Sequence, residues 1–375
     1  MSAYIYPIKM ALVIFPFLAL LLSFPLFIKE YRKYGSFPVI KGVLIYSFIF
    51  YLLTAFFLTM LPLPSKEVVA QMTSPRIQLI PFANVQAFLR DTFLNWREPS
   101  TYLPAMKQSV FLEPLFNIFL TIPFGIYLRY YFRCSLKKTV LLSFCLSLFF
   151  EVTQFTGLYF IYPRPYRLAD VNDLINNTLG GLIGFALAPL LAKILPTRQE
   201  IDELSYHKGQ TVSFLRRVVA FLLDWGVIWG FRIVFNPLYT KASPYMWLVE
   251  ILVYFCLIPA INNGQTFGKA IVRIRVVTLA DERVGFFRMT ARYLLLYGVT
   301  NGLLALAGYF NEAFTTANTP NANAESILPL LIYSVLFSGL VLVQGAILLI
   351  GLLMKRLLYY ESISKTKEIS TIIKK

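Results

Sequence analysis

The stretch Glu151–Gly184, EVTQFTGLYFIYPRPYRLADVNDLINNTLGGLIG, places a short polar segment between two apolar runs. We call its polar side chains the polar corner: Glu151, Gln154, Arg164, Arg167, Asp170, Asp173, Asn176 and Asn177. Glu151 and Gln154 are three positions apart. Asp170, Asp173 and Asn177 are three and four apart, so each group lies on one face of a helix. Charged side chains at membrane depth are costly, and they therefore indicate a functional site.

The composition is that of an all-α polytopic membrane protein. Of the 375 residues, 57% are hydrophobic and the mean hydropathy is +0.64. Several runs approach or exceed the roughly 20 apolar residues that cross a bilayer. A soluble protein this apolar would have little left to cover its surface. The net charge of +16 is therefore expected to set the topology and to meet membrane lipids, and not to bind nucleic acid.

Cysteine and histidine usage excludes several chemistries. Cys134, Cys145 and Cys256 lack Cys-x-x-Cys spacing, so neither a disulfide framework nor a zinc site is indicated. The only histidine, His207, lies in a polar segment and cannot supply an H-E-x-x-H motif or a Ser-His-Asp triad. We therefore predict no metal and no cofactor. The apolar N-terminal stretch lacks the features of a signal peptide and is interpreted as a retained helix.

About nine transmembrane helices are predicted. They cover about residues 10–28, 42–61, 113–132, 139–158, 174–195, 216–235, 244–262, 291–310 and 327–354. The loops on one side of this arrangement hold 25 Lys and Arg residues, and the loops on the other side hold 10. The positive-inside rule places the richer side in the cytoplasm. The N-terminus is then outside, the C-terminus is cytoplasmic, and the protein is multi-pass in the cell membrane.

A charged stretch divides the spans into two groups. Residues 196–213, PTRQEIDELSYHKGQTVS, form the long polar connection between spans. We predict a five-helix membrane domain at 1–195, a cytoplasmic linker at 196–213 and a four-helix membrane domain at 214–375.

In this topology the polar corner converges at the outer face. Glu151 and Gln154 end the fourth span there, Asp173 opens the fifth, and Asn117 of the third span could join them. One interpretation is a binding or catalytic site for an external or lipid-linked molecule. The alternative is structural: an aspartate caps a helix, and Arg167 pairs with Glu151. The small-residue pair GGLIG at 180–184 favours close helix packing.

The first half resembles the VanZ-like family. The resemblance covers about residues 10–195 and rests on E-x-x-Q at 151–154, R-x-x-D-x-x-D at 167–173 and N-T-x-G-G at 177–181. The tripeptide at 80–82, IPF, and the run from Asn117 to Gly125 are similar as well. The family implies a bacterial membrane protein linked to low-level resistance to glycopeptides, teicoplanin in particular.

The second half is similar to RDD membrane domains. Arg217, Ala220 and Asp224 carry this resemblance, followed by GQTFGK at 264–269 and RIRVV at 273–277. Asp281 is the candidate for the remaining acidic position, and transport is the function often suggested for the family. Arg217 and Asp224 form a second polar cluster that is either functional or a tie near the cytoplasmic end. The G-x-x-x-G-K run is one residue too short for a P-loop and lacks its Ser or Thr, so ATP binding is not inferred.

Three further segments have predicted structures. Apolar residues at helical spacing over 85–96 predict either an interfacial helix or a loop packed on the bundle. The alternation in AIVRIRVVTL, 270–279, followed by a turn, predicts a hairpin-like or extended segment. The basic run KTKEISTIIKK, 365–375, predicts a disordered tail near anionic lipid.

Three functions stay open from the sequence. The first is a non-enzymatic protein that binds or modulates a lipid-linked precursor, a lipid headgroup or a glycopeptide such as teicoplanin through the outer polar corner. The second is a membrane enzyme in which Glu151, Asp170 and Asp173 perform acid–base chemistry on a lipid-linked substrate. The third is an ion or small-solute transporter, which repeated or discontinuous helices would favour.

Overall fold

A computed structural model describes residues 2–73, 75–235, 246–318, 324–354 and 356–372. Helices make up 75% of it, and two small two-stranded sheets complete the regular structure of these ranges. The chain divides into two compact units, which are described separately. Unit 1 comprises Met1–Ser23 and Val39–Asp202, and unit 2 comprises Phe24–Pro38 and Glu203–Lys375. The divisions fall inside α1 (Ser2–Tyr34), between Pro38 and Val39, and inside α10 (Arg198–Gly209). The last of these lies within the stretch predicted to be a linker.

Helices long and apolar enough to cross a bilayer occur in both units. Within the described ranges there are six: Ile5–Tyr34, Val39–Met60, Ser109–Tyr130, Val171–Leu191, Phe286–Ala317 and Ile327–Leu353. A shorter apolar helix covers Met246–Ile261, and α7 (Leu136–Phe155) and α11 (Phe214–Val234) are helical where spans were expected. The chain is an all-α, multi-pass membrane protein. The number nine and the orientation stay predictions.

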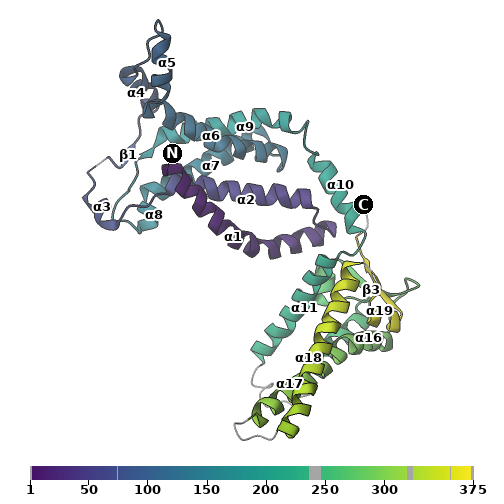
Figure 1. Cartoon of the computed structure of the whole chain (residues 1–375). Coiled ribbons are helices and arrows are strands. Elements are labelled where there is room, and N and C mark those ends of the chain that lie inside the picture. Colours follow the sequence, from purple (N-terminus) through teal and green to yellow (C-terminus); the bar gives the residue numbers. More distant parts are fainter. Residues whose placement is uncertain (1, 74, 236–245, 319–323, 355, 373–375) are drawn as a thin grey trace. The chain divides into compact units, whose positions relative to one another are not determined.

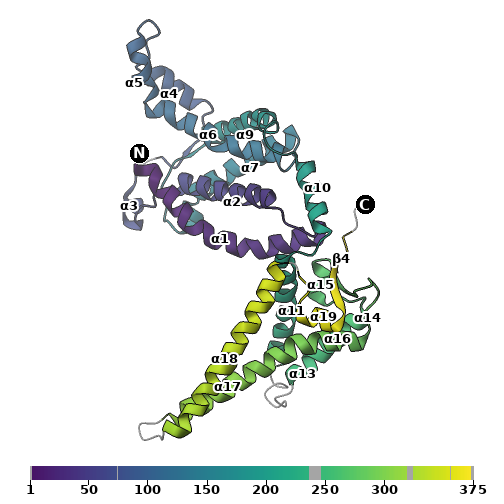
Figure 2. The ribbon, with the colours of Figure 1, turned by 45° about the vertical axis from the view of Figure 1, so that its right-hand side comes forward.

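Unit 1 is organised around the tight pairing of α6 (Ser109–Tyr130) with α9 (Val171–Leu191). Figures 1 and 2 show these helices side by side with α7, next to α2 (Val39–Met60) and α1 (Ser2–Tyr34). A Cβ atom at Gly180 would overlap the carbonyl oxygen of Ile118, and one at Gly184 would overlap that of Ile122. The predicted packing role of these glycines is confirmed, because only glycine permits this approach.

Two loops of unit 1 meet at one end of α9. Strand β1 (Ile77–Gln78) pairs in parallel with β2 (Ala169–Asp170), which leads directly into the helix. The hydroxyl of Tyr162 donates to the carbonyl of Pro64 at 2.8 Å, and that of Tyr166 donates to the carbonyl of Met60 at 3.0 Å. These bonds fix the loop after α7 and its short α8 (Gly157–Phe160) beside the segment after α2, which contains α3 (Lys66–Gln71).

The segment predicted to be either an interfacial helix or a loop packed on the bundle is helical over α4 (Ala83–Asp91). It precedes η1 (Pro99–Thr101) and α5 (Tyr102–Met106), and Figure 2 shows α4 and α5 extending from the α6 end of the unit. The ring of Phe88 contacts that of Phe111, with centroids 5.8 Å apart. Leu89, Phe93 and Trp96 are exposed by 73%, 70% and 80%, so the apolar side chains of this segment only partly pack on the unit.

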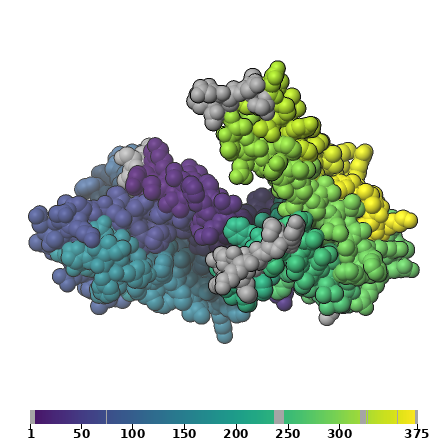
Figure 3. Space-filling model, turned by 90° about the horizontal axis from the view of Figure 1, so that it is seen from below, coloured from purple at the N-terminus to yellow at the C-terminus, as the bar shows by residue number. Residues whose placement is uncertain are grey.

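Unit 2 combines long helices with a small polar layer. Its elements after α11 are α13 (Met246–Glu250), η2 (Ile251–Leu257), α14 (Ile258–Ile261), α15 (Phe267–Ile271), β3 (Ile274–Thr278), α16 (Phe286–Tyr293), η3 (Leu294–Gly298), α17 (Val299–Ala317), α18 (Ala324–Leu353), α19 (Tyr359–Ser364) and β4 (Thr366–Ser370). Helices α17 and α18 form a long hairpin that stands out from the rest of this unit in Figures 2 and 3. A buried cluster of Phe255, Met289, Tyr293 and Tyr297 lies at its base.

The prediction of a disordered C-terminal tail is wrong for residues 366–372. Residues 366–370 form β4, which pairs antiparallel with β3 in a register that sets Val276 opposite Glu368. The predicted hairpin after 270–279 is reduced to a turn with one bridge, between Val277 and Arg283. The composition of the tail misled the prediction, because its one glutamate, Glu368, meets buried cations of unit 2 that lie far away in the sequence.

Candidate functional site

The polar corner begins with Asp170, which is the N-cap of α9. Its Oδ1 accepts hydrogen bonds from the backbone N–H of Asn172 at 2.8 Å and from the Asn172 side chain at 2.7 Å. The backbone N–H of Asp170 donates to Oε2 of Glu151 at 2.9 Å. Gln154 lies on the same face of α7 and donates to the carbonyl of Thr59 at 3.1 Å. The capping alternative is thus realised for Asp170, while Glu151 and Asp170 are held together across α7 and α9.

Deeper along α9, the predicted residues Asp173 and Asn177 join three helices. Nδ2 of Asn117 on α6 donates to Oδ1 of Asp173 at 2.5 Å. Nδ2 of Asn177 donates to the hydroxyl of Ser147 on α7 at 2.9 Å. The hydroxyl of Thr121 on α6 donates to the Asn177 carbonyl at 2.7 Å. Asn117 therefore belongs to the polar corner, as its position predicted.

The two arginines of the corner have different surroundings. Nη2 of Arg167 donates to the carbonyl of Leu61 at 2.7 Å. Arg164 is half-buried, and its carbonyl packs against Gly157, which has a φ of +59°. In the ranges that the structure describes, no ion pair joins Arg167 to Glu151. The clasp that the structural interpretation required is therefore not formed there, and the carboxylates of the corner meet neutral donors.

A cleft of about 220 Å³ opens at the N-terminal end of α9. Its polar lining consists of three carboxylates and three amides: Glu113, Asp170, Asp173, Gln78, Asn84 and Asn172. Among the described residues that line the cleft there is no lysine or arginine. The predicted set is thereby divided, because Asp170 and Asp173 line the cleft while Glu151, Gln154, Arg167 and Asn177 do not.

A stripe of small hydroxyl residues continues from the corner along α7. Thr139, Ser143 and Ser147 are fully buried and four positions apart, so they share a face with Glu151. The Ser143 hydroxyl lies where a Cβ on Gly181 would be. The hydroxyls of Thr139 and Ser143 have no hydrogen-bond partner in the described chain.

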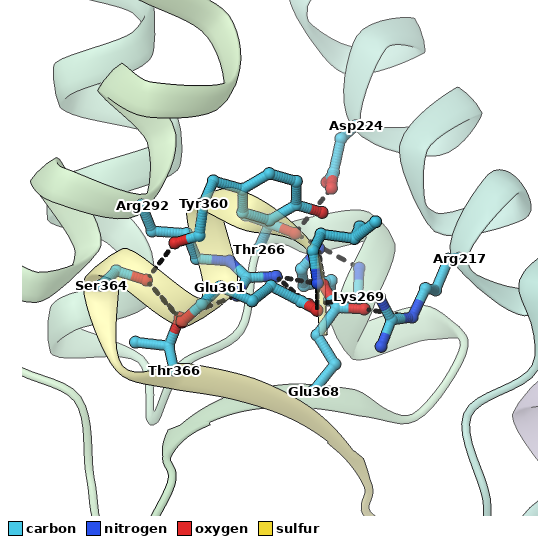
Figure 4. A network of polar contacts seen from close by, with 11 residues as sticks. Arg217, Asp224, Thr266, Lys269, Arg292, Tyr360, Glu361, Ser364, Thr366 and Glu368 are labelled. Atoms are coloured by element: carbon cyan, nitrogen blue, oxygen red, sulfur yellow. Dashed lines mark hydrogen bonds and ion pairs between the residues drawn. The ribbon is translucent and has the colours of Figure 1, made fainter. Parts of the chain in front are cut away.

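The second predicted cluster belongs to a larger charge network in unit 2 (Figure 4). We define this network by its charged members: Arg217, Asp224, Lys269, Arg292, Glu361 and Glu368. Arg217 contacts Glu361 at 3.2 Å and Glu368 at 3.1 Å. Arg292 contacts the same two carboxylates at 3.0 and 3.1 Å. Nζ of Lys269 is 3.0 Å from Glu368, so two glutamates serve three cations.

Asp224 occupies a separate part of the network. Its carboxylate accepts hydrogen bonds from the Thr266 hydroxyl at 2.7 Å, the Gly268 backbone N–H at 2.7 Å and the Tyr254 hydroxyl at 2.8 Å. A Cβ at Gly268 would overlap the carbonyl of Ala220. The G-Q-T-x-G-K run therefore forms the start of α15 around the carboxylate of Asp224. No direct Arg217–Asp224 tie is formed in the described residues.

The protonation states of the network follow from its pairing. Burial disfavours the charged form of Glu368, but Lys269, Arg217 and Arg292 outweigh it and hold the pKa of its carboxyl well below the usual range. Burial by itself would lower the pKa of the Lys269 ammonium group. The neighbouring Glu368 outweighs burial, so this pKa is raised. Asp281 does not join the network; it is 63% exposed and pairs with Lys367 at 3.0 Å.

Comparison with known families agrees with these two sets of residues. The family model described as VanZ/LLP1 matches residues 48–192, and the model of the RDD family matches residues 211–359. The chain joins a VanZ-like half to an RDD half. No curated protein and no solved structure matches the chain.

Sequence reasoning missed residues in both halves. In the VanZ-like half these are Asn172, Gln78 and Asn84, although Gln78 and Asn84 flank the IPF tripeptide, whose Ile80 carbonyl accepts from Asn172 at 3.1 Å. In the RDD half the missed residues are Arg292, Glu361 and Glu368. Both glutamates lie beyond residue 359, where the RDD match ends, so no family motif pointed to them.

Proposed function

We propose that the VanZ-like half binds an amine-bearing component of the cell envelope at the cleft. The proposal rests on the lining of the cleft. Three carboxylates and three amides occur there, without a lysine or arginine among the described lining residues. Carboxylates attract an ammonium group and repel a phosphate. A lipid headgroup, a lipid-linked precursor or a glycopeptide such as teicoplanin can each present such a group.

The surroundings of the cleft support a ligand at the membrane surface. Ala83, Asn84 and Ala87 of α4 line it, and the exposed side chains of Leu89, Phe93 and Trp96 follow in the sequence. Aromatic and apolar side chains of this kind favour the interface between headgroups and acyl chains. In the predicted topology this is the outer leaflet of the cell membrane.

The test is a binding measurement on full-length protein in nanodiscs. We expect added dioleoylphosphatidylethanolamine to bind and dioleoylphosphatidic acid, which lacks the amine, not to bind. Teicoplanin and an amine-bearing cell-wall precursor serve as competitors. Asp173→Asn should weaken binding about tenfold or more, whereas Asp91→Asn, the same change at an exposed carboxylate outside the cleft, should not. Equal binding by the two variants would contradict the proposal.

The hydroxyl stripe on α7 favours one other function, transport of an ion or proton. Buried polar groups inside the membrane mark conduction paths in transporters, and Thr139, Ser143 and Ser147 extend inward from Glu151. Ser143→Ala should then abolish proton flux in proteoliposomes, while Cys145→Ala, on an exposed face of the same helix, should leave it unchanged. Absence of flux in the unmodified protein would exclude this function.

A further inference from the structure

The RDD half contains a cavity that the proposed function does not use. Its volume is about 260 Å³, and it lies against α11, α16, η3 and α18. One part of the lining is the charge network, with Arg217, Lys269 and Arg292. The other part is apolar, with Phe221, Leu296, Leu348 and Leu352. The cavity is therefore amphipathic, with cations at one end and hydrocarbon at the other.

The cations at the polar end outnumber the carboxylates that they contact directly. Arg217, Lys269 and Arg292 share only Glu361 and Glu368. Asp224 also lines the cavity, but its carboxylate is already bound by three neutral donors. Three cations thus contact two carboxylates directly, while Asp224 acts on Lys269 through its charge without an ion-pair contact. An anionic oxygen in the cavity would add a direct charge-assisted contact to these cations.

Two buried hydrogen-bond donors at this end lack an acceptor. Arg292 and Tyr293 are 1% and 2% exposed, and both line the cavity. The Nε of Arg292 and the hydroxyl of Tyr293 have no hydrogen-bond partner among the described residues. Buried donors are normally satisfied, and an exception of this kind points to a bound acceptor. Arg292 Nε can only donate, so the missing partner is an oxygen acceptor.

The apolar end distinguishes a lipid from a free anion. Leu348 and Leu352 are one helical turn apart on α18 and face the cavity, and the neighbouring Leu349 and Leu353 are 49% and 59% exposed. The volume is below the roughly 300–1,000 Å³ of pockets that enclose a drug-sized ligand. It suits a headgroup, with acyl chains continuing along the exposed apolar surface of α18.

We infer that this cavity binds an anionic phospholipid, with its phosphate at Arg292 and Tyr293 and its acyl chains against Leu348 and Leu352. The inference is independent of the cleft in the VanZ-like half, because the two share no residue. Tyr293 and Leu348 separate this site from a purely structural network. The Arg292 guanidinium lies over the Tyr293 ring, but the Tyr293 hydroxyl has no hydrogen-bond partner among the described residues, and Leu348 belongs to the apolar part of the lining.

The experiment uses the full-length protein purified in detergent. Dioleoylphosphatidylglycerol, dioleoylphosphatidylcholine or inorganic phosphate is added, and retained lipid is counted by native mass spectrometry while Tm is recorded. We expect phosphatidylglycerol to be retained at one molecule per chain and to raise Tm, and the other two to do neither. Equal retention of both lipids, or the full Tm shift with inorganic phosphate alone, would overturn the inference.

Matched variants locate the lipid. Leu348→Trp fills the apolar end and should reduce retention of phosphatidylglycerol at least tenfold, whereas Leu349→Trp, one position along the same helix, should retain it. Tyr293→Phe removes one unpartnered donor without changing the volume greatly, so retention should fall several-fold while Tm without lipid is unchanged. If Leu348→Trp does not fold, unchanged retention in Tyr293→Phe still refutes the site.

Discussion

The polar corner and the charge network use carboxylates in opposite ways. In the corner, Asp170 and Asp173 accept hydrogen bonds from amide groups, and Arg167 donates to a backbone carbonyl instead of an acid. In the network, Glu361 and Glu368 each contact more than one cation. Carboxylates held by neutral donors remain available to a cationic ligand, whereas those paired with buried cations serve stability first. The two halves therefore differ in what neutralising one acid should do.

The largest expected effect is the loss of Glu368. Glu368→Gln leaves Arg217 and Arg292 with Glu361 alone and removes the carboxylate that Lys269 contacts. Breaking a buried pair typically costs about 3–5 kcal/mol. Because the whole stability of a domain is about 5–15 kcal/mol, little folded protein should remain. Chemical denaturation in detergent measures the free energy of unfolding of the variant, with Glu282→Gln in the exposed turn as the control. Stability equal to that of the control would mean that the network is dispensable.

The next effect concerns the close packing of α6 against α9 in unit 1. Gly184→Ala places a methyl group on the carbonyl of Ile122 and should cost about 1–3 kcal/mol by overpacking. Gly230→Ala on α11, where a Cβ meets nothing within 4 Å, should leave Tm unchanged or raise it slightly. A Gly184→Ala variant as stable as Gly230→Ala would show that α6 and α9 can separate without penalty.

A smaller effect on stability, with a large one on function, is expected at Asp173. Asp173→Asn keeps the shape and the bond to Asn117, so stability should change by less than about 1 kcal/mol. If the cleft binds an envelope component that affects glycopeptide action, the variant should abolish any shift in teicoplanin susceptibility that expression of the protein causes. A variant that is lost from the membrane would place Asp173 with the structural acids of the network.

The smallest effect on Tm is expected from a change of pH within the neutral range. The pKa of Glu368 is lowered in the folded state, so its contribution is complete above the unfolded value of roughly 4.3. That contribution is lost as the pH falls from there toward the folded value. The Tm of the protein should therefore be nearly constant between about pH 6 and 7. The contribution of Glu368 to Tm should decline only below about pH 4.3. A decline that begins near neutrality would require a different titrating group.

Local patterns predicted much of the arrangement around these sites. The spacing of Glu151, Asp170 and Asp173 places them near one another because α7 and α9 are consecutive long helices. The close approach at Gly180 and Gly184 also followed from spacing alone. These predictions succeeded because each depends on residues within one helix or on two neighbouring helices.

The partners of Arg217 could not be predicted in this way. Glu361 is 144 residues away from it and lies just before the basic run predicted to be a disordered tail. Strand β3 likewise pairs mainly with β4 and not with the turn that follows it in sequence. Ion pairs carry no periodic signal, so sequence spacing cannot identify which distant acid meets a buried cation.

The separation in sequence between Arg217 and its partners Glu361 and Glu368 has a consequence during synthesis. At about 5–20 residues per second, the 144 residues that separate Arg217 from Glu361 take roughly 7–30 s to translate. Throughout that interval α11 carries an arginine whose counter-charges do not yet exist. We expect its charged end to lie in the headgroup region, where lipid phosphates can accompany it, until β4 forms on β3. Maturation of the RDD half is thus delayed by the order in which its charges are made.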